Sequence, residues 1–387
     1  MSLRLVLDHE SLFTTLADLV SINSVNPQYA GGPGEAALAA YVGDYLTRND
    51  ISFKLQPVFD GRPNVIARLE GRPGGRTLIL EAHMDTASEL GMSRKPFEPV
   101  REGNRMFGRG ACDAKGGLAA MLHALKVLRD AKLQPKASVV LVAAVDEEFS
   151  FRGIAKFLEN EVKADGAIVA EPTSLDIVIA SKGVLRWRLR THGRAAHSSK
   201  PHLGINAVAK MAKVIVAVEE RFPPLFEKRR HQLVGSPTLN VGIISGGIQV
   251  NQVPDSCVIE IDRRLIAGET KESVRGEFES FLAELRAHDP ELEVEVEAPT
   301  IEDYPLETPV TERIVQVVMG VSQEVAGRGR AIGVPYGSDA SKLAKAGIPA
   351  VILGPGSIDQ AHAAEEFVEL DQVALAAEIY ARAILEF

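Results

Sequence analysis

The sequence predicts an α/β protein: a mixed, mainly parallel sheet flanked by helices, with a smaller α+β domain inserted into it. Two patterns support this prediction. At both ends of the chain, apolar strand-like runs alternate with amphipathic helix-like stretches, which is typical of a parallel sheet covered on both faces. The middle of the chain instead reads strand, helix, two strands, helix and strand, the order of a two-layer ferredoxin-like fold.

The outer parts of the chain supply the elements of the larger domain. Apolar spacing predicts helices over residues 11–22, 35–49, 117–128 and 371–385. Short apolar runs predict strands at residues 64–69, 77–82, 137–145, 166–170 and 348–353. Because these strands alternate with helices, we expect most of them to be parallel.

The middle of the chain supplies the inserted domain. Strands are expected at residues 183–191, 239–245, 257–264 and 292–297, and helices at 204–218 and 270–287. The α/β pattern resumes after about residue 300. We therefore place the larger domain at residues 1–177 and 296–387, and the inserted domain at 178–295.

Composition excludes several classes of protein. The chain has 387 residues, of which 45% are hydrophobic, and a formal net charge of −9. This balance argues against a nucleic-acid partner, and no apolar run reaches the roughly 18 residues of a membrane span. Only Cys112 and Cys257 are present, which excludes a disulfide scaffold and favours a reducing compartment. Since the N-terminus has no long apolar signal segment, we expect a cytoplasmic protein.

Acidic and histidine motifs follow four of the predicted strands, and one more precedes a helix. They are His83 and Asp85 after 77–82, Glu147 and Glu148 after 137–145, Glu171 after 166–170, His362 after 348–353, and Asp113 before 117–128. The carboxyl ends of parallel strands form one edge of a sheet, and functional crevices open there. We therefore expect these side chains to converge.

The chemistry of this group suits metal ions. Two imidazoles and several carboxylates are donors for zinc, and also for cobalt or manganese. Asp113, Glu148 and Glu171 carry three negative charges. Together with one hydroxide, they balance the four positive charges of two divalent cations. A bridging carboxylate with a bridging hydroxide holds two metals about 3.5–4 Å apart. The sequence therefore predicts two divalent metal ions, most simply zinc.

Two acidic residues have separate expected roles. Asp85 lies two residues beyond His83 and can accept the proton of its other ring nitrogen, which fixes the tautomer. Glu147 stands beside Glu148 and is left as the general base, which takes a proton from metal-bound water and passes it to the leaving nitrogen.

Each motif alone has a simpler explanation. Asp-Glu-Glu is common at a solvated helix start, and Glu-Pro-Thr is common in turns. Asp113 before a helix suits an N-cap. Only the combination of these motifs at strand ends favours the metal site over these explanations.

The combined motifs resemble those of a two-zinc metallopeptidase family that includes acetylornithine deacetylase, succinyl-diaminopimelate desuccinylase, aminoacylase and glutamate carboxypeptidase. The matching segments are residues 83–86, 108–117, 146–148, 171–173 and 196–199, and the resemblance extends from end to end. It implies a zinc-exopeptidase-like fold. It also implies that the inserted domain is a lid and dimerisation domain, so that the protein is a homodimer.

The resemblance implies a role for each metal-site residue. His83 and Glu171 would hold one metal ion, and Glu148 and His362 the other. Asp113 would bridge them, with a cis peptide bond to Ala114. Glu147 would be the general base.

Further positions resemble substrate contacts. His197 would polarise the scissile carbonyl. Asn251 and Arg264 would contact a substrate carboxylate, the arginine through its bidentate fork. The loop of Gly354, Gly356 and Ser357 would offer backbone N–H groups to the same carboxylate.

Three segments of the sequence bear on the substrate class. Residues 171–175, 237–240 and 354–362 look most like acetylornithine deacetylase, which implies metal-dependent hydrolysis of a small N-acyl amino acid. Met84 and residues 87–89 depart from the family pattern beside the metal site. A dipeptidase, carboxypeptidase or desuccinylase with the same two metals therefore remains an alternative. A non-catalytic binding protein of the same fold is a third class, and it would lack stoichiometric metal and hydrolysis.

Overall fold

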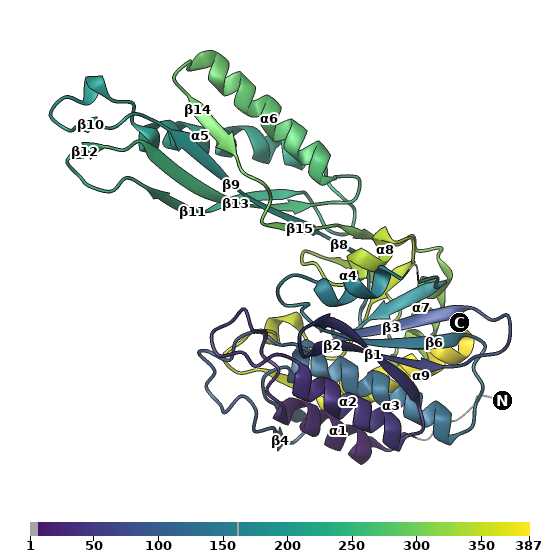
Figure 1. The fold of residues 1–387 in the computed structure, drawn as a ribbon. Helices are drawn as coiled ribbons and strands as arrows, with labels where there is room; N and C mark the ends of the chain where they lie inside the picture. Colours follow the sequence, from purple (N-terminus) through teal and green to yellow (C-terminus); the bar gives the residue numbers. More distant parts are fainter. Residues whose placement is uncertain (1–6, 161) are drawn as a thin grey trace. The chain divides into compact units, whose positions relative to one another are not determined.

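The computed structural model describes residues 7–160 and 162–387, which form two compact units (Figure 1). The first unit comprises the described residues up to Ile179, together with Thr308–Ile332 and Ser338–Phe387. The second unit comprises Ala180–Glu307 and Gly333–Gly337. The inserted segment therefore runs about a dozen residues beyond the expected end at 295. The reason is that β15 (Ile301–Asp303) pairs with β9 (Gly183–His192) inside the second unit.

The first unit is organised around a mixed sheet. Its strand order is β1-β2-β6-β3-β7-β18-β8, and the central strands β6, β3, β7 and β18 are parallel to one another. The strands are β1 (Ser52–Phe59), β2 (Arg62–Leu69), β3 (Thr77–His83), β6 (Ser138–Ala144), β7 (Gly166–Val169), β8 (Ile177–Ser181) and β18 (Ala350–Ile352). β1, β2 and β8 are antiparallel to their neighbours. The predicted mixed sheet with parallel central strands is confirmed.

Helices cover both faces of this sheet. Figure 1 shows α1, α2, α3 and α9 on one side and α4 and α8 on the other. The helices are α1 (His9–Ser21), α2 (Ala36–Arg48), α3 (Gly116–Asp130), α4 (Arg152–Leu158), α7 (Arg313–Ala326), α8 (Ala340–Lys345) and α9 (Leu370–Glu386). α3 is buried on nearly all sides and comes so close to the end of β7 that a Cβ on Gly117 would lie 2.5 Å from the Ala170 Cβ. Glycine is therefore required where α3 enters the core.

A small sheet, the short strand β17 and two short turns complete this unit's connections. The sheet is antiparallel, in the order β19-β5-β4. Its strands are β4 (Val100–Glu102), β5 (Arg105–Phe107) and β19 (Phe367–Glu369). β17 (Ala331–Val334) precedes α8, and the single turns are η1 (Ala111–Lys115) and η3 (Ile358–Gln360). β19 joins the C-terminal part of the chain to the segment before η1.

The second unit is a two-layer α+β structure. Its sheet has the order β11-β13-β9-β14 and is antiparallel, with β15 also paired to β9. The remaining strands are β10 (Ala196–His197), β11 (Thr238–Gly246), β12 (Gln252–Val253), β13 (Ser256–Leu265), β14 (Glu293–Val296) and β16 (Leu306–Glu307). The helices are α5 (Ala207–Glu227), α6 (Lys271–His288) and the single turn η2 (Pro201–Leu203).

An aromatic cluster forms the core of the second unit. Phe222 of α5 stacks on Phe278 of α6 at 5.4 Å between ring centroids, and Phe278 meets Trp187 of β9 edge-on. α5 continues nine residues past the expected end at Val218, because Phe222 and Phe226 are buried on this side of the helix. Pro223 and Pro224 lie within this extension.

None of the helices in the described part of the chain has the length and apolar character needed to cross a membrane.

Candidate metal centre

The predicted metal-site motifs lie at the ends of adjacent parallel strands. His83 is the last residue of β3, Glu147 and Glu148 follow β6, and Glu171 follows β7. β6 and β7 flank β3 on either side. The strand order therefore places these acidic groups around His83, as expected for the carboxyl edge of a parallel sheet.

Two groups of potential ligands form at this edge. One consists of His83, Glu147 and Glu171, and the other of Asp113, Glu148 and His362. Within each group the donor atoms lie within 4.8 Å of one another. All of these residues belong to the first unit. The structure thus brings together the five residues expected as ligands, and the expected base.

Asp113 lies between the two histidines. Its Oδ1 is 3.1 Å from His83 Nε2, and its Oδ2 is 3.5 Å from His362 Nε2. Each carboxylate oxygen therefore faces a different imidazole, which is the arrangement that a carboxylate bridging two metal ions requires. The Asp113–Ala114 peptide bond is cis.

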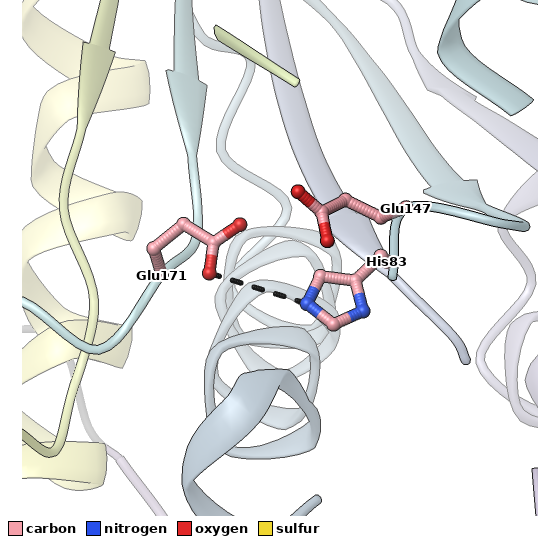
Figure 2. Close-up of side chains that lie close together, drawn as sticks. All are labelled: His83, Glu147 and Glu171. Carbon is pink, nitrogen blue, oxygen red and sulfur yellow. Dashed lines mark ion pairs between the residues drawn. The ribbon is translucent and has the colours of Figure 1, made fainter. Parts of the chain in front are cut away.

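Of the two remaining expected ligands, Glu171 lies near His83 and Glu148 lies near His362. Glu171 Oε2 is 4.0 Å from His83 Nε2, and Glu148 Oε1 is 3.0 Å from His362 Nε2. Figure 2 shows the Glu171 carboxylate to the left of the His83 ring and the Glu147 carboxylate above it, with the dashed line joining Glu171 to the ring. The division of these ligands between two metal ions stays a prediction.

Glu147 belongs to the first group, and the pKa of its carboxyl group is raised, as are those of Glu171 and Glu148. Burial, with the field of Glu148 and Asp113, outweighs the effect of His83 and raises the pKa of Glu147 to about 8. A carboxyl group with a pKa near neutrality can both accept and return a proton during turnover. Its position beside His83 and Glu171 allows a metal-ligand role as well, so geometry alone leaves both roles open.

The electrostatics of the site show an excess of negative charge. Burial lowers the pKa of His83, but its hydrogen bonds to Asp113 and Asp85 outweigh this and raise the pKa well above the usual value. Hydrogen bonds to Asp113 and Glu148 raise the pKa of His362 to about 10. Burial, with the charges of Glu147 and Asp113, raises the pKa of Glu171 well above its ordinary value. Crowded acids of this kind favour bound cations, and the N and O donors fit zinc.

Asp85 has a different main contact from the expected one. His83 Nδ1 lies 3.0 Å from the main-chain oxygen of Asp85 and 3.6 Å from the carboxylate. The nearer acceptor for His83 is therefore a backbone carbonyl. The Asp85 carboxylate instead accepts hydrogen bonds from the amides of Glu147 and Glu148, each at 3.1 Å. It thus supports the loop that carries the other two acids.

A buried polar network continues behind Asp85. Asn26 Nδ2 donates to Asp85 at 2.8 Å and to Asp146 at 2.9 Å. The Asp146 amide donates to Glu35, which also binds Arg62 through two nitrogens. The network fixes the residues on both sides of Glu147 to the N-terminal segment.

The glycine loop after β18 does not match its expected role. The Gly354 amide donates to Thr173 Oγ1 at 3.1 Å, and the Gly356 amide donates to Gln372 Oε1 at 2.9 Å. Two of the three N–H groups expected to bind a substrate carboxylate, those of Gly354 and Gly356, therefore have partners within the protein. A Cβ on Gly356 would lie 2.4 Å from Cys112 Sγ, so this glycine is explained by close packing. Ser357 is half-buried and its Oγ accepts from the Asp359 amide.

The remaining candidates belong to the second unit. His197 is exposed in β10, where its Nδ1 lies 2.8 Å from Ser199 Oγ. Asn251 is exposed between β11 and β12. Arg264 is half-buried in β13, and its Nε donates to Asp262 at 2.8 Å. An ion pair within the same strand therefore already engages the arginine that was expected to bind a substrate carboxylate.

Sequence reasoning missed the polar residues that support the ligands. Asn26, Glu35 and Glu366 are buried and bind the ligand-bearing loops, yet they follow no strand and belong to no spacing pattern. The sole signal for Glu366 is its position four residues after His362.

Comparison with known proteins gives relatives across most of the chain. The acetylornithine deacetylase of Vibrio campbellii is 30% identical over 384 residues, covering 97% of this chain and 97% of the relative. The acetylornithine deacetylase of Erwinia tasmaniensis is 34% identical over 331 residues, covering 83% of each. Among solved structures, the aminopeptidase PepT of Bacillus cereus superposes with a TM-score of 0.80 at 21% identity, covering 98% of this chain and 99% of that chain. That likeness shows the fold.

Residues 79–386 match the family model described as peptidase family M20/M25/M40. This match covers far more than half of the chain. It agrees with the relatives above and with the two groups of metal donors. The chain therefore belongs to peptidase family M20/M25/M40, and it is a hydrolytic enzyme that cleaves an amide bond with the help of metal ions.

Proposed function

We propose that this enzyme removes the acyl group from a small N-acyl amino acid, using two divalent metal ions that are most simply zinc. The observation that carries the proposal is the position of Asp113, whose Oδ1 and Oδ2 lie 3.1 and 3.5 Å from the Nε2 atoms of His83 and His362. In this proposal, Glu171 completes the ligands on the His83 side and Glu148 those on the His362 side.

Bound divalent ions at this site would lower the pKa of a water molecule and polarise the amide carbonyl. Glu147 accepts the proton of the attacking water and delivers it to the leaving amine. Its raised pKa, about 8 in the protein without metal ions, is consistent with a group that holds a proton between these two steps. We propose His197 as the hydrogen-bond donor to the developing oxyanion, and this role is based on the family resemblance alone.

The proposed substrate class is supported by the named relatives. Both compared relatives are acetylornithine deacetylases, at 30% and 34% identity. A peptidase activity with the same two metals is the second candidate, because the superposed structure is named an aminopeptidase. A desuccinylase with the same two metals is a further alternative, and a preference for N-succinyl over N-acetyl substrates would identify it.

A substrate panel tests the proposal. Purified enzyme loaded with Zn²⁺ is assayed for amine release from N-acetyl and N-succinyl amino acids and from dipeptides, with Co²⁺ and Mn²⁺ as parallel loadings. We expect the highest kcat/KM for an N-acetyl amino acid. Dipeptides cleaved faster than every N-acyl amino acid would overturn the substrate class, and absence of stoichiometric metal by elemental analysis would overturn the metal centre.

A pair of adjacent variants tests the division of roles. Glu147→Gln should retain two metal ions and lose turnover by about 10²–10⁴-fold, the usual contribution of a general base. Glu148→Gln should lose metal ions as well as turnover. Full turnover by metal-loaded Glu147→Gln would remove Glu147 from the base role, and loss of metal from it would make it a ligand.

We also propose that the enzyme is a homodimer formed through β11. This strand is the edge of its sheet, and Ile243 and Ile244 are 56% and 53% exposed. The following loop exposes Ile248 and Val250 almost fully. A long apolar edge strand can add a second copy across a two-fold axis and bury both rows of isoleucines.

Light scattering checks the dimer. The parent should have the mass of two chains at micromolar concentration, and Ile244→Lys should shift it toward one chain. Val216→Lys, which places the same charge on exposed α5, is the matched control and should stay dimeric. A monomeric parent would contradict the proposal.

We further propose a cytoplasmic location, which the free thiols Cys112 and Cys257 support and cell fractionation would check.

A further inference from the structure

Glu366 is buried beside the turn that carries Asp113. Only 1% of the residue is exposed, and its carboxylate accepts four hydrogen bonds. Oε1 accepts from the amides of Cys112 and Asp113 at 3.0 and 3.1 Å. Oε2 accepts from the Gly110 amide at 3.0 Å and from Arg109 Nη1 at 2.7 Å. One carboxylate thus binds four of the five residues from 109 to 113.

The turn depends on this acceptor because it is not a regular helix. Within η1, Asp113 (φ −121°, ψ 96°) and Ala114 (φ −125°, ψ 30°) have non-helical backbone angles. The amides of Cys112 and Asp113 donate to the carboxylate of Glu366, a residue distant in the sequence. A buried amide that loses its acceptor is unfavourable, so the turn would rearrange without Glu366.

Glu366 also ties this turn to the His362 loop. It lies four residues after His362, and its main-chain oxygen accepts from the Gly108 amide at 3.1 Å. The next residue, Phe367, begins β19 and pairs with Phe107 of β5. The same short segment therefore carries His362 and holds the turn of Asp113. The separation between Asp113 Oδ2 and His362 Nε2 depends on this contact.

We propose that Glu366 is a positioning residue of the metal centre, holding the carboxylate of Asp113 at the place where it can bridge two ions. This inference rests on the proposed function, in which Asp113 is the bridge. Glu366 itself touches neither imidazole in the hydrogen bonds described, so its role is exerted through the backbone of Asp113. Arg109 is 2% exposed and balances its charge, which keeps both oxygens available as acceptors.

The test is the isosteric substitution Glu366→Gln. A glutamine has one acceptor oxygen, and its NH₂ group would face a pair of N–H donors, so at least two of the four hydrogen bonds would be lost. The full chain is stripped of metal and titrated with Zn²⁺ against a chromophoric chelator. We expect affinity to fall about 10–100-fold, the usual effect of removing an outer partner of a metal ligand. The visible spectrum of the Co²⁺-loaded variant should also change, because the bridging geometry changes.

Two matched variants separate this role from a general effect on folding. Glu365→Gln alters the neighbouring residue, which is exposed and pairs with Arg94 at 3.0 Å. Glu269→Gln alters a half-buried carboxylate in the second unit, which accepts hydrogen bonds from Arg263 at 2.6 Å and from the Ile266 amide at 3.0 Å. Both variants should bind Zn²⁺ as tightly as the parent and give its Co²⁺ spectrum.

The outcomes are distinguishable from failure of the proposed function. A parent that binds no metal overturns the metal centre itself. A parent that binds two ions, with Glu366→Gln binding them equally well, overturns only the role of Glu366. If Glu366→Gln does not fold, hydrogen exchange on the metal-free parent decides. The amides of Cys112 and Asp113 should be as protected as those of α3, and rapid exchange there would overturn the inference.

Discussion

The Asp85 carboxylate accepts a hydrogen bond from the main-chain amide of Glu147 at 3.1 Å. Its second oxygen accepts from the amide of Glu148 at the same distance. One fully buried carboxylate at the end of β3 thus fixes the backbone of the two acids that follow β6. Because the proposed base and a proposed ligand are neighbours in the chain, this contact determines where each side chain begins.

Asp85→Asn should reduce turnover more than metal affinity. The amide NH₂ of asparagine would face the N–H of Glu147 or Glu148, and one of these hydrogen bonds would be lost. The main-chain oxygen of Asp85, which is the nearer acceptor for His83 Nδ1, is unchanged. We expect kcat to fall about 10–100-fold. Steady-state kinetics with measured metal content checks this, with exposed Asp44→Asn as control, and a parent-like kcat would contradict it.

Gly356→Ala should destabilise the first unit through two separate effects. The residue has φ +83°, and its new Cβ would lie 2.4 Å from Cys112 Sγ. Left-handed backbone costs alanine about 1–2 kcal/mol, and overpacking a core about 1–3 kcal/mol. In a Cys112→Ala background the clash with Sγ is absent, so the backbone cost and a tight 3.3 Å contact with Val368 Cγ2 should remain. A double-mutant cycle by urea unfolding checks this, and simple additivity would show that the clash is relieved elsewhere.

Stability should fall with acidification through His123. This residue of α3 is fully buried, and neither ring nitrogen has a hydrogen-bond partner within residues 7–160 and 162–387. Burial, assisted by Lys126, lowers the pKa of His123 to about 4, whereas the unfolded chain takes up the proton near pH 6.5. The folded state binds fewer protons between these values. Its stability contribution is therefore full above pH 6.5 and is lost as the pH falls to 4.

The size of this effect should be about 3 kcal/mol for a shift of this magnitude. His123→Leu removes the titrating group while keeping an apolar side chain of similar size. The difference in unfolding free energy between parent and variant should change by that amount between pH 7 and pH 4. Exposed His288→Gln is the control. A constant difference across this range would assign the acid sensitivity to other groups.

Metal removal should lower the thermal stability of the protein. Without cations, the acids Asp113, Glu147, Glu148 and Glu171 remain crowded around two imidazoles, and their repulsion opposes folding. Bound ions at 1,000 times their dissociation constant contribute about 4 kcal/mol. Calorimetry with and without a chelator checks this, and added Zn²⁺ should restore the transition. Glu148→Gln should respond less, and an unchanged transition in the parent would argue against tight binding.

The sequence was sufficient to predict those site residues that directly follow a short apolar strand. β3, β6 and β7 are short apolar runs, and the residues after them form one sheet edge whatever the rest of the fold does. This is why His83, Glu148 and Glu171 could be placed together in advance. β1 was missed because its first four residues are exposed and show no alternation.

Other features depend on contacts between distant parts of the chain. The inserted unit ends beyond residue 295 because Ile301 pairs with Arg186, which no local pattern encodes. Gly354 and Gly356 were interpreted as substrate donors, but Thr173 and Gln372 accept their N–H groups in the folded chain. Polar supports of this kind become recognisable only when their partners are known.

All the donor atoms of the metal centre come from the first unit, and the second unit supplies none of them. The inserted segment therefore contributes none of the proposed metal ligands and not the proposed base, although it carries His197. Exchanging residues 180–307 between relatives would keep the proposed metal ligands and Glu147, but it would replace His197, the proposed donor to the oxyanion. Members of a family arranged in this way can differ in substrate specificity while they keep the same metal ligands.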